Sequence, residues 1–436
     1  MNTIAIGILG CLFLLFLLFI SQPVGFTLAI VGCVGFLAVM HNPSAAYHLM
    51  VTSTFDTFSK YDYTVIPLFV LMGQLAYHSG ISKRLFQAAY DWLGFLPGGL
   101  NIATVGASAA FGAICGSGPA TTATIAAVAL PEMRARKYSL SLGGGAVAAG
   151  GGLGMLIPPS MVFIAYGIMT EQSPARLFIA GIVPGIFLAL LFSLYIIYVC
   201  RRHPELGPAA PPVSWSRRFR SLSGVLETLV LFLLVIGGMF LGWFTPTEAA
   251  AVGAAGALAI AAFRKKLTWK ILVRSLQETL RTSVMILVII AGAMIFGRFL
   301  AVTGIPDGIA GTLTTLPLPG WCILTFILIF FIIMGMVVDA LAMVLMTIPI
   351  FYPVILKLGY DPVWFGVMVV TVVQIGVLTP PVGLNAYVVS GMMRDVPLQK
   401  VFRGCIPFVG VLMVGAAIMT IFPQIALWLP NLMLGK

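Results

Sequence analysis

Two interrupted apolar runs decide the fold of this chain: residues 150–160 read GGGLGMLIPPS, and residues 376–385 read GVLTPPVGLN. Each run carries a Pro-Pro pair inside a segment, 140–168 or 362–390, that is long and apolar enough to cross a bilayer. Proline lacks an N–H group and clashes with the preceding helical turn, so each segment is predicted to be a broken helix. Freed carbonyl groups at that depth are tolerated only where protein or a wet cavity covers them. A plain kink with close glycine packing is the alternative.

The two Pro-Pro pairs are 222 residues apart, and other residues recur at nearly the same spacing. The matched pairs are Pro23 and Pro246, Gly80 and Gly304, Pro97 and Pro319, Gly116 and Gly335, Tyr138 and Tyr360, and Pro174 and Pro397. We interpret this as a duplication, with a first repeat at 1–202, a Pro-rich basic cytoplasmic linker at 203–220 and a second repeat at 221–436. Each half is expected to cross the membrane an odd number of times, so the second copy is predicted to be inverted.

The composition of the chain is that of a polytopic membrane protein. Of its 436 residues, 60% are apolar and 8% are charged, whereas soluble proteins carry roughly 25% charged residues. The apolar residues would fill at most about 13 spans of roughly 20 residues each. This excludes a soluble enzyme, a disordered chain and a single-anchor protein, and it predicts an all-α polytopic fold. Residues 1–20 are apolar with no basic residue before them, so we expect a retained first span rather than a signal peptide.

The Lys and Arg residues indicate on which side each loop lies. We assume an outside N-terminus and two re-entrant hairpins, at 98–133 and 318–356. The inside loops then hold 19 of the 24 Lys and Arg residues, including Arg394 and, in a polar arm at 264–281, Arg281. Lys436 is one of the five left outside. Positive charges collect in cytoplasmic loops, so both termini are expected to be periplasmic. Four tryptophans near predicted span ends fit lipid-interface anchors: Trp243, Trp269, Trp321 and Trp428.

The turns of the two predicted hairpins place polar atoms inside apolar segments. The first turn, residues 116–122, reads GSGPATT, and the second, residues 335–342, reads GMVVDALA. The hydroxyl and carbonyl oxygens of the first turn would suit a hard monovalent cation, and the alternative for this turn is a loop at the membrane surface. Asp339 is an acid deep in an apolar region, which makes it a functional candidate. The alternative is an Asp that caps the second arm of its hairpin.

Motifs of other functions are absent from the sequence. The six Cys residues form no C-x-x-C pair, and the four His residues show no metal spacing. The sequence has no G-x-x-x-x-G-K loop for ATP and no H-E-x-x-H zinc motif. The net charge of +11 is attributed to basic cytoplasmic loops rather than to nucleic-acid binding. We therefore expect no enzyme activity, no cofactor and no ATPase partner.

Five segments resemble the large membrane subunit of tripartite ATP-independent periplasmic (TRAP) transporters, in order and over nearly the full chain. They are GSGPATT at 116–122, LIPPS at 156–160, LFIAGIVPG at 177–185, PTEAAAVG at 246–253 and TPPVGLN at 379–385. The resemblance implies sodium-coupled uptake of an organic acid across the bacterial inner membrane. It implies two partners, a periplasmic solute-binding protein and a small four-helix membrane subunit, which we expect on a separate chain. It also implies a scaffold and a transport domain that moves like an elevator.

The resemblance also implies two sodium sites, each formed by a hairpin tip and a broken helix. The residues implied for the first site are Ser117, Gly118, Gly154, Ile157 and Pro159. Those implied for the second are Gly335, Gly376, Thr379 and Val382. This chain has Ser117-Gly118-Pro119 where many members have a run of serines, so backbone carbonyl groups would carry more of the first site.

The small carboxylate substrate is predicted to lie between the two hairpin tips, near Ser117, Thr121, Asp339 and Asn385. Helix ends directed at this point would favour its negative charge. The main alternative function is a stand-alone ion-coupled carboxylate carrier that needs no binding protein. An ABC-type permease, a membrane-embedded enzyme or a channel fits less well, because inverted repeats with two half-sites suit alternating access.

Overall fold

The chain folds almost wholly into α-helices. The computed structural model describes residues 3–20, 22–315, 317–393 and 396–434, and these contain no β-strand. Arg394 and Lys436, both used in the sequence-based topology, lie outside the described residues. Within them, six helices are long and apolar enough to cross a membrane singly, or seven if the bent pair Tyr61–His78 and Ile81–Leu93 forms one span. The predicted all-α polytopic class is confirmed.

The first half of the chain contains a helical hairpin followed by an interrupted helix. Its helices are α1 (Thr3–Phe19), α2 (Val24–Met40), α3 (Pro43–Ser59), α4 (Val65–His78), α5 (Ile81–Leu93), α6 (Gly99–Cys115), α7 (Gly118–Ala135), α8 (Leu140–Gly152), α9 (Met161–Thr170) and α10 (Pro174–Arg202). Short 3-10 turns lie at Tyr61–Thr64, Leu153–Met155 and Pro204–Leu206. Helices α6 and α7 form the hairpin, and the interruption between α8 and α9 contains Pro158-Pro159, as predicted.

The second half follows the same order of elements. Its helices are α11 (Trp215–Phe232), α12 (Gly238–Phe240), α13 (Pro246–Phe263), α14 (Trp269–Thr303), α15 (Ile305–Thr315), α16 (Gly320–Gly335), α17 (Ala340–Lys357), α18 (Pro362–Gly376), α19 (Leu384–Met392), α20 (Leu398–Ile421) and α21 (Gln424–Leu434), with a π-helical turn at Leu233–Gly237. The second hairpin is α16 and α17, and the second interruption lies between α18 and α19. The arm predicted at 264–281 is not a separate element, because its residues from Trp269 onward are continuous with the span after it in the 35-residue α14.

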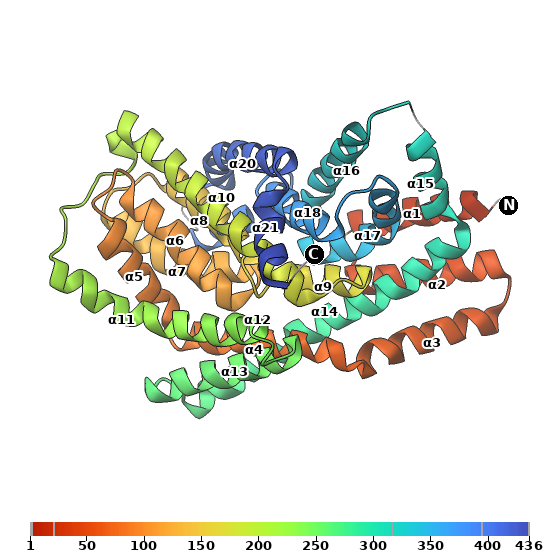
Figure 1. Cartoon of the computed structure of the whole chain (residues 1–436), viewed down its shortest axis with the longest axis horizontal. Helices are drawn as coiled ribbons and strands as arrows, with labels where there is room; N and C mark the ends of the chain where they lie inside the picture. Colours follow the sequence, from red (N-terminus) through yellow and green to blue (C-terminus); the bar gives the residue numbers. More distant parts are fainter. Residues whose placement is uncertain (1–2, 21, 316, 394–395, 435–436) are drawn as a thin grey trace.

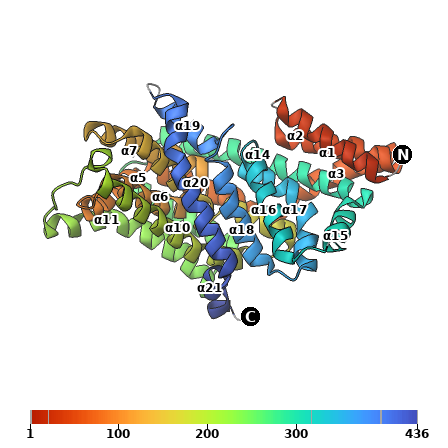
Figure 2. The ribbon, with the colours of Figure 1, turned by 90° about the horizontal axis from the view of Figure 1, so that it is seen from above.

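Contacts between the two halves occur in matched pairs. Helix α2 packs against α14, while α4 packs against α13; α8 packs against α20, while α10 packs against α18. The second arm of each hairpin also contacts a helix of the other half, namely the helix that follows that half's interruption. Helix α7 packs against α19, and α17 packs against α9. Figures 1 and 2 show the result, an elongated molecule with α1 and α2 at one end and α5 and α11 at the other. This pairing supports the proposal of two repeated halves.

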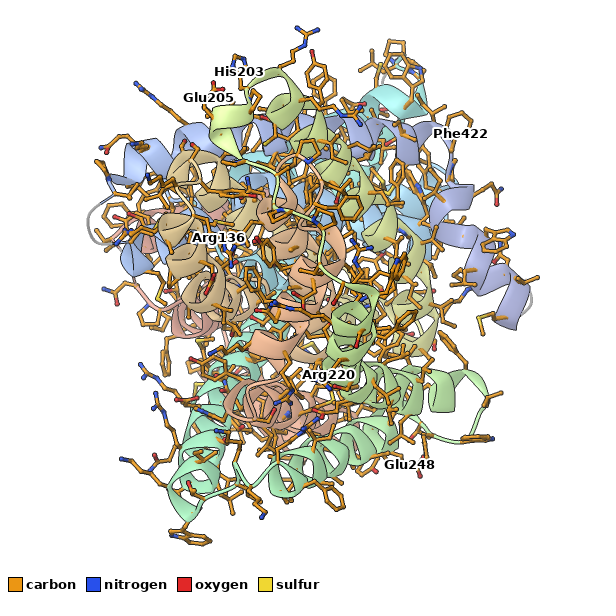
Figure 3. All side chains as sticks on the ribbon, turned by 90° about the vertical axis from the view of Figure 1, so that its left-hand side faces the viewer. Arg136, His203, Glu205, Arg220, Glu248 and Phe422 are labelled. Carbon is orange, nitrogen blue, oxygen red and sulfur yellow. The ribbon has the colours of Figure 1, made fainter. Side chains whose placement is uncertain are left out.

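The linker between the halves is fixed to the base of the first hairpin. The Gly207 carbonyl accepts a hydrogen bond from the N–H of Gly98 at 2.9 Å, and the N–H of Ala210 donates to Gly94 at 2.9 Å. The Tyr138 hydroxyl donates to the Pro208 carbonyl. Burial raises the pKa of Tyr138 to about 12, so this hydroxyl keeps its proton at neutral pH. The linker also reaches the rim of the molecule, where Figure 3 shows His203 and Glu205.

If the two halves are inverted repeats, the loop before α8 and the loop before α18 lie on opposite sides of the membrane. Tyr138 is buried, so we choose the exposed Lys137 as the reporter of the first loop and the exposed Lys357, at the end of α17, as the reporter of the second. In a cysteine-free background, Lys137→Cys should react with an impermeant maleimide only in inside-out vesicles, and Lys357→Cys only in spheroplasts. Reaction of both from one face would contradict the inverted arrangement.

Candidate functional site

The first hairpin tip is bound directly to the first helix interruption. The N–H of Met161, the first residue of α9, donates to the Gly116 carbonyl at 3.2 Å. Within the interruption, the Ser160 hydroxyl donates to the Met155 carbonyl and accepts a hydrogen bond from the Phe163 N–H at 3.3 Å. The interruption is therefore held by its own hydrogen bonds and by the tip of the hairpin beside it.

The second half repeats this arrangement with different residues. The N–H of Val382 donates to the Met336 carbonyl in the second hairpin tip at 3.2 Å. The Thr379 hydroxyl donates to the Ile375 carbonyl at 2.6 Å, and the Asn385 N–H donates to Val377 at 3.1 Å. Each hairpin tip thus receives one backbone N–H from the interruption in its own half.

Paired glycines allow each hairpin to approach its interrupted helix closely. A Cβ added to Gly112 would lie 2.6 Å from the Cα of Gly154, and a Cβ added to Gly376 would lie 2.7 Å from the Cα of Gly335. Both distances are too short for a real side chain, so the backbones are in contact. Gly154, Gly335 and Gly376 belong to the implied sodium sites. Close packing of the backbone requires glycine at these positions, whether or not they also contact a cation.

A cavity of about 980 Å³ lies between the two hairpin tips. Its lining includes the first residue of each of the four helices that follow a hairpin tip or an interruption: Gly118 of α7, Met161 of α9, Ala340 of α17 and Leu384 of α19. Helix N-termini carry partial positive charge and unpaired N–H groups. Side chains cap α9 and α17, but α7 and α19 have no side-chain cap. The cavity is therefore suited to an anion.

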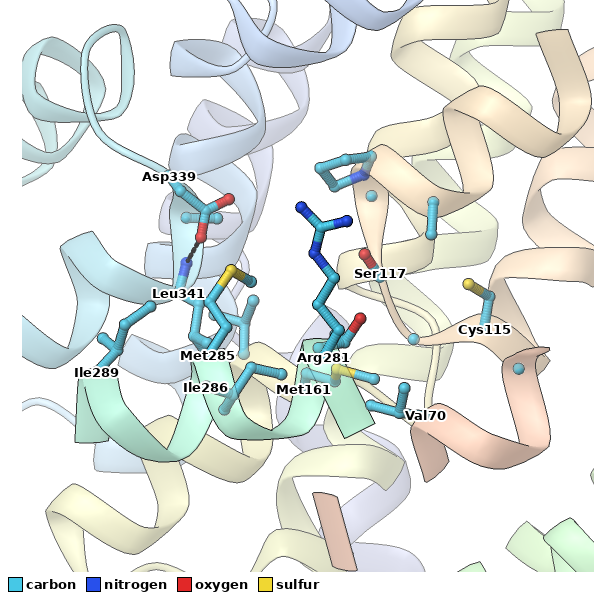
Figure 4. Close-up of a pocket in the computed structure, with 18 of the residues that line it drawn as sticks. Val70, Cys115, Ser117, Met161, Arg281, Met285, Ile286, Ile289, Asp339 and Leu341 are labelled. Atoms are coloured by element: carbon cyan, nitrogen blue, oxygen red, sulfur yellow. Dashed lines mark hydrogen bonds between the residues drawn. The ribbon is translucent and has the colours of Figure 1, made fainter. Parts of the chain in front are cut away.

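Arg281 of α14 adds a full positive charge to the cavity. Figure 4 shows its side chain extending from α14 into the space between Asp339 and Ser117. Arg274, two turns earlier, pairs with Glu278 at 2.8 Å, and Glu278 also contacts His78 at 3.3 Å. In the described part of the chain, Arg281 has no ion-pair partner. It is therefore the charged group most available to a ligand.

Asp339 both caps a helix and lines the cavity. Its Oδ2 atom accepts a hydrogen bond from the Leu341 N–H at 3.1 Å, so the capping alternative considered for this residue is confirmed. The residue is also exposed toward the cavity. Contact between Asp339 and a ligand stays a prediction.

The other predicted site residues fall into two groups. Ser117 and Gly118 line the cavity, whereas Ile157, Pro159, Thr379 and Val382 lie in the interruptions and do not. Thr121 and Asn385, predicted to bind substrate, are fully buried outside the cavity lining.

Both buried residues are directed at the first interrupted helix. The buried Thr121 hydroxyl lies next to the Cys115 thiol, and a Cβ added to Gly154 would lie 2.6 Å from its oxygen. The Asn385 side-chain amide donates to the Ala148 carbonyl at 3.1 Å, which ties α19 to α8. This geometry suits Thr121 to the first cation site and gives Asn385 a structural contact between the halves.

Sequence reasoning missed Arg281 because it was placed in the polar arm. Since α14 continues through that boundary, Arg281, Met285 and Ile289 recur every fourth residue on one helical face, and all three line the cavity. A periodicity scan that crossed from the arm into the apolar run would have found this shared face.

The chain is similar to known proteins both in sequence and in fold. The chain matches the family model described as "Tripartite ATP-independent periplasmic transporter, DctM component" over residues 10–425. It is 36% identical to the C4-dicarboxylate TRAP transporter large permease protein DctM of Pseudomonas aeruginosa, over 92% of this chain and 93% of that protein. It is 32% identical to the sialic acid TRAP transporter large permease protein SiaM of Vibrio cholerae, over 96% of this chain and 97% of that protein. The solved YdaH transporter of Alcanivorax borkumensis shares the fold, with a TM-score of 0.61 and 14% identity over 93% of this chain and 98% of that chain.

Replacing Gly376 with alanine should force the second hairpin away from its interrupted helix. Overpacking of this kind costs about 1–3 kcal/mol, so Gly376→Ala should lower the melting temperature of the purified protein. Gly391→Ala in α19 is the matched control, because nothing lies within 4 Å of the added Cβ. The control should melt at or slightly above the wild-type temperature, since alanine favours a helix over glycine. Equal melting temperatures for the two variants would disprove the close contact.

Proposed function

This chain belongs to the DctM component family of tripartite ATP-independent periplasmic transporters, and from that premise we propose that it uses a sodium gradient to import a small carboxylate. The family assignment rests on the match over residues 10–425. The relatives described above are permeases named for C4-dicarboxylates and for sialic acid, which are organic acids. Secondary transport of an organic acid is therefore the activity; the sodium coupling and the partners are our proposal.

The convergence of positive groups on one cavity carries this proposal. The N-termini of the four helices that follow a hairpin tip or an interruption line the same space as the unpaired Arg281. Helix N-termini stabilise anions, and an arginine can pair with a carboxylate through two parallel hydrogen bonds. Much of the rest of the lining is apolar, so a bound substrate that displaces water from this surface would strengthen these interactions.

We assign the coupling ions to the two contacts between hairpin tip and interruption. The 3-10 turn that continues α8 ends at Met155, and α18 ends at Gly376. Helix C-termini expose carbonyl oxygens and carry partial negative charge, which suits Na⁺. The buried Thr121 hydroxyl beside Gly154 fits a cation at the first contact. At the second, Thr379 donates its proton to Ile375 and keeps its oxygen lone pairs available.

The proposal includes both partners and a location. We propose that a periplasmic solute-binding protein delivers the carboxylate, with both chain termini on the periplasmic side of the bacterial inner membrane. Helices α1–α3 expose large apolar side chains, including Phe16, Phe26 and Phe55. Such a surface suits contact with lipid and with the small four-helix membrane subunit. In the elevator mechanism, the hairpin tips and interruptions would move past α14.

Replacing Arg281 should remove the main charge contact with the substrate. In proteoliposomes that contain the permease, the small subunit and the binding protein, Arg281→Gln should lower the initial uptake rate by about tenfold or more, because a hydrogen bond to a charged group is worth about 1.5–3 kcal/mol. Wild-type uptake should also require an inward sodium gradient. The measurement is accumulation of the labelled carboxylate that the binding protein releases.

Lys270→Gln is the matched control for this experiment. Lys270 is a cation on the same helix, but it does not line the cavity. This variant should keep the wild-type rate, and a loss as large as that of Arg281→Gln would contradict the assigned role of Arg281. Uptake that persists without a sodium gradient would refute the coupling. Uptake without the binding protein would favour the stand-alone carrier.

A further inference from the structure

The cavity between the hairpin tips offers one unpaired positive side chain. Its charged lining residues are Arg274, Glu278, Arg281 and Asp339. Arg274 is neutralised by Glu278, and Asp339 is an acid. Among the described residues, Arg281 is the one cation of this lining that lacks an ion pair. A bound anion therefore meets a single full positive charge, close to the uncapped N-terminus of α7.

The wall that continues from Arg281 along α14 is apolar. Figure 4 shows Met285 and Ile289 on the same side of the cavity as Asp339 and Leu341. Ile286, Ile289 and Leu341 are each less than 10% exposed. A ligand group that extends from Arg281 in this direction contacts methyl and thioether groups.

These two features discriminate between carboxylates. A second carboxylate against this wall would lose its hydration without gaining a cation, and it would approach the carboxyl group of Asp339. A branched aliphatic or aromatic group in the same place would gain from the burial of apolar surface. The chemistry of the wall thus opposes a dicarboxylate and favours an apolar substituent.

We propose that the carboxylate taken by this site is a monocarboxylate with an apolar body. The inference rests on the proposed function, because it specifies the organic acid of that same site. The carboxylate pairs with Arg281 beside the N-terminus of α7, and the apolar body lies along Met285 and Ile289. This preference separates the chain from its Pseudomonas aeruginosa relative, which is named for C4-dicarboxylates.

Two isosteric probes test the preference directly. In 4-methylpentanoate, an isopropyl group replaces the second carboxylate of succinate. Equilibrium dialysis of labelled 4-methylpentanoate against the full chain in lipid nanodiscs with sodium chloride should show binding, and succinate should displace it at least tenfold less well than unlabelled 4-methylpentanoate. The ratio follows from the burial of apolar groups and from the unpaired second charge. Arg281→Gln should abolish binding of the labelled probe.

Met285→Lys supplies the second cation that the cavity lacks. Met285 is 56% exposed and one turn from Arg281, so a lysine there can be accommodated and would face the same space. This variant should bind succinate more tightly and 4-methylpentanoate more weakly than the wild type. Leu280→Lys, which adds the same charge at a 66% exposed position outside the cavity lining, should leave both affinities unchanged.

The outcomes separate this inference from the proposed function. If succinate binds as tightly as 4-methylpentanoate, and Arg281→Gln abolishes both, the apolar preference is wrong and the carboxylate site stands. If Met285→Lys does not shift the ratio toward succinate, the stated position of the apolar body is wrong. If neither probe binds, or if binding is unaffected by Arg281→Gln, this inference is wrong, and the uptake assay with all three proteins decides the proposed function separately.

Discussion

A backbone polar group that leaves a helix inside the lipid layer must find its partner within the protein, because no water is available there. This chain meets that constraint twice, at the interruptions between α8 and α9 and between α18 and α19. Each interruption donates one N–H to the adjacent hairpin tip, from Met161 to Gly116 and from Val382 to Met336. The hairpins therefore cover the exposed backbone and, with the interruptions, enclose the cavity. An interruption without its hairpin would leave peptide groups unpaired in an apolar medium.

The covering of each interruption also depends on the other half of the chain. Helix α9 packs against α17 of the second hairpin, and α19 packs against α7 of the first. Helices α8 and α20 approach so closely that a Cβ on Gly145 would collide with the Gly404 carbonyl, and a Cβ on Gly404 with the Ser141 carbonyl. Small residues permit such contacts between membrane helices, where dispersion rather than water exclusion holds helices together. One half alone would lack these contacts, which would give the proposed duplication a structural reason.

The parts of this fold that depend on local backbone chemistry could be predicted from the sequence. Pro158-Pro159 and Pro380-Pro381 mark both interruptions, and the small residues at 116–118 mark the first hairpin turn. The parts that depend on long-range packing could not. The polar composition of residues 264–281 suggests a separate arm, yet packing continues the helix through it and brings Arg281 to the cavity. Nothing in the local sequence distinguishes Asn385, which turns toward α8, from a residue that faces the cavity.

The polarity of an interrupted helix offers a physical basis for coupling. At each interruption, the preceding helix presents its negative C-terminal end and the following helix presents its positive N-terminal end, so a cation and an anion can bind a few residues apart. Each ion would stabilise the other electrostatically, and by linkage the effect is reciprocal.

Arg281 differs from these groups because it belongs to α14. This helix packs against α2 and α4 as well as against α17 of the second hairpin. If the tips move past α14, the carboxylate contacts Arg281 in one state and leaves it in the other. The sodium ions bound at the tips would then remain as its counter-charge, and a substrate without them would lose its electrostatic partner during the crossing.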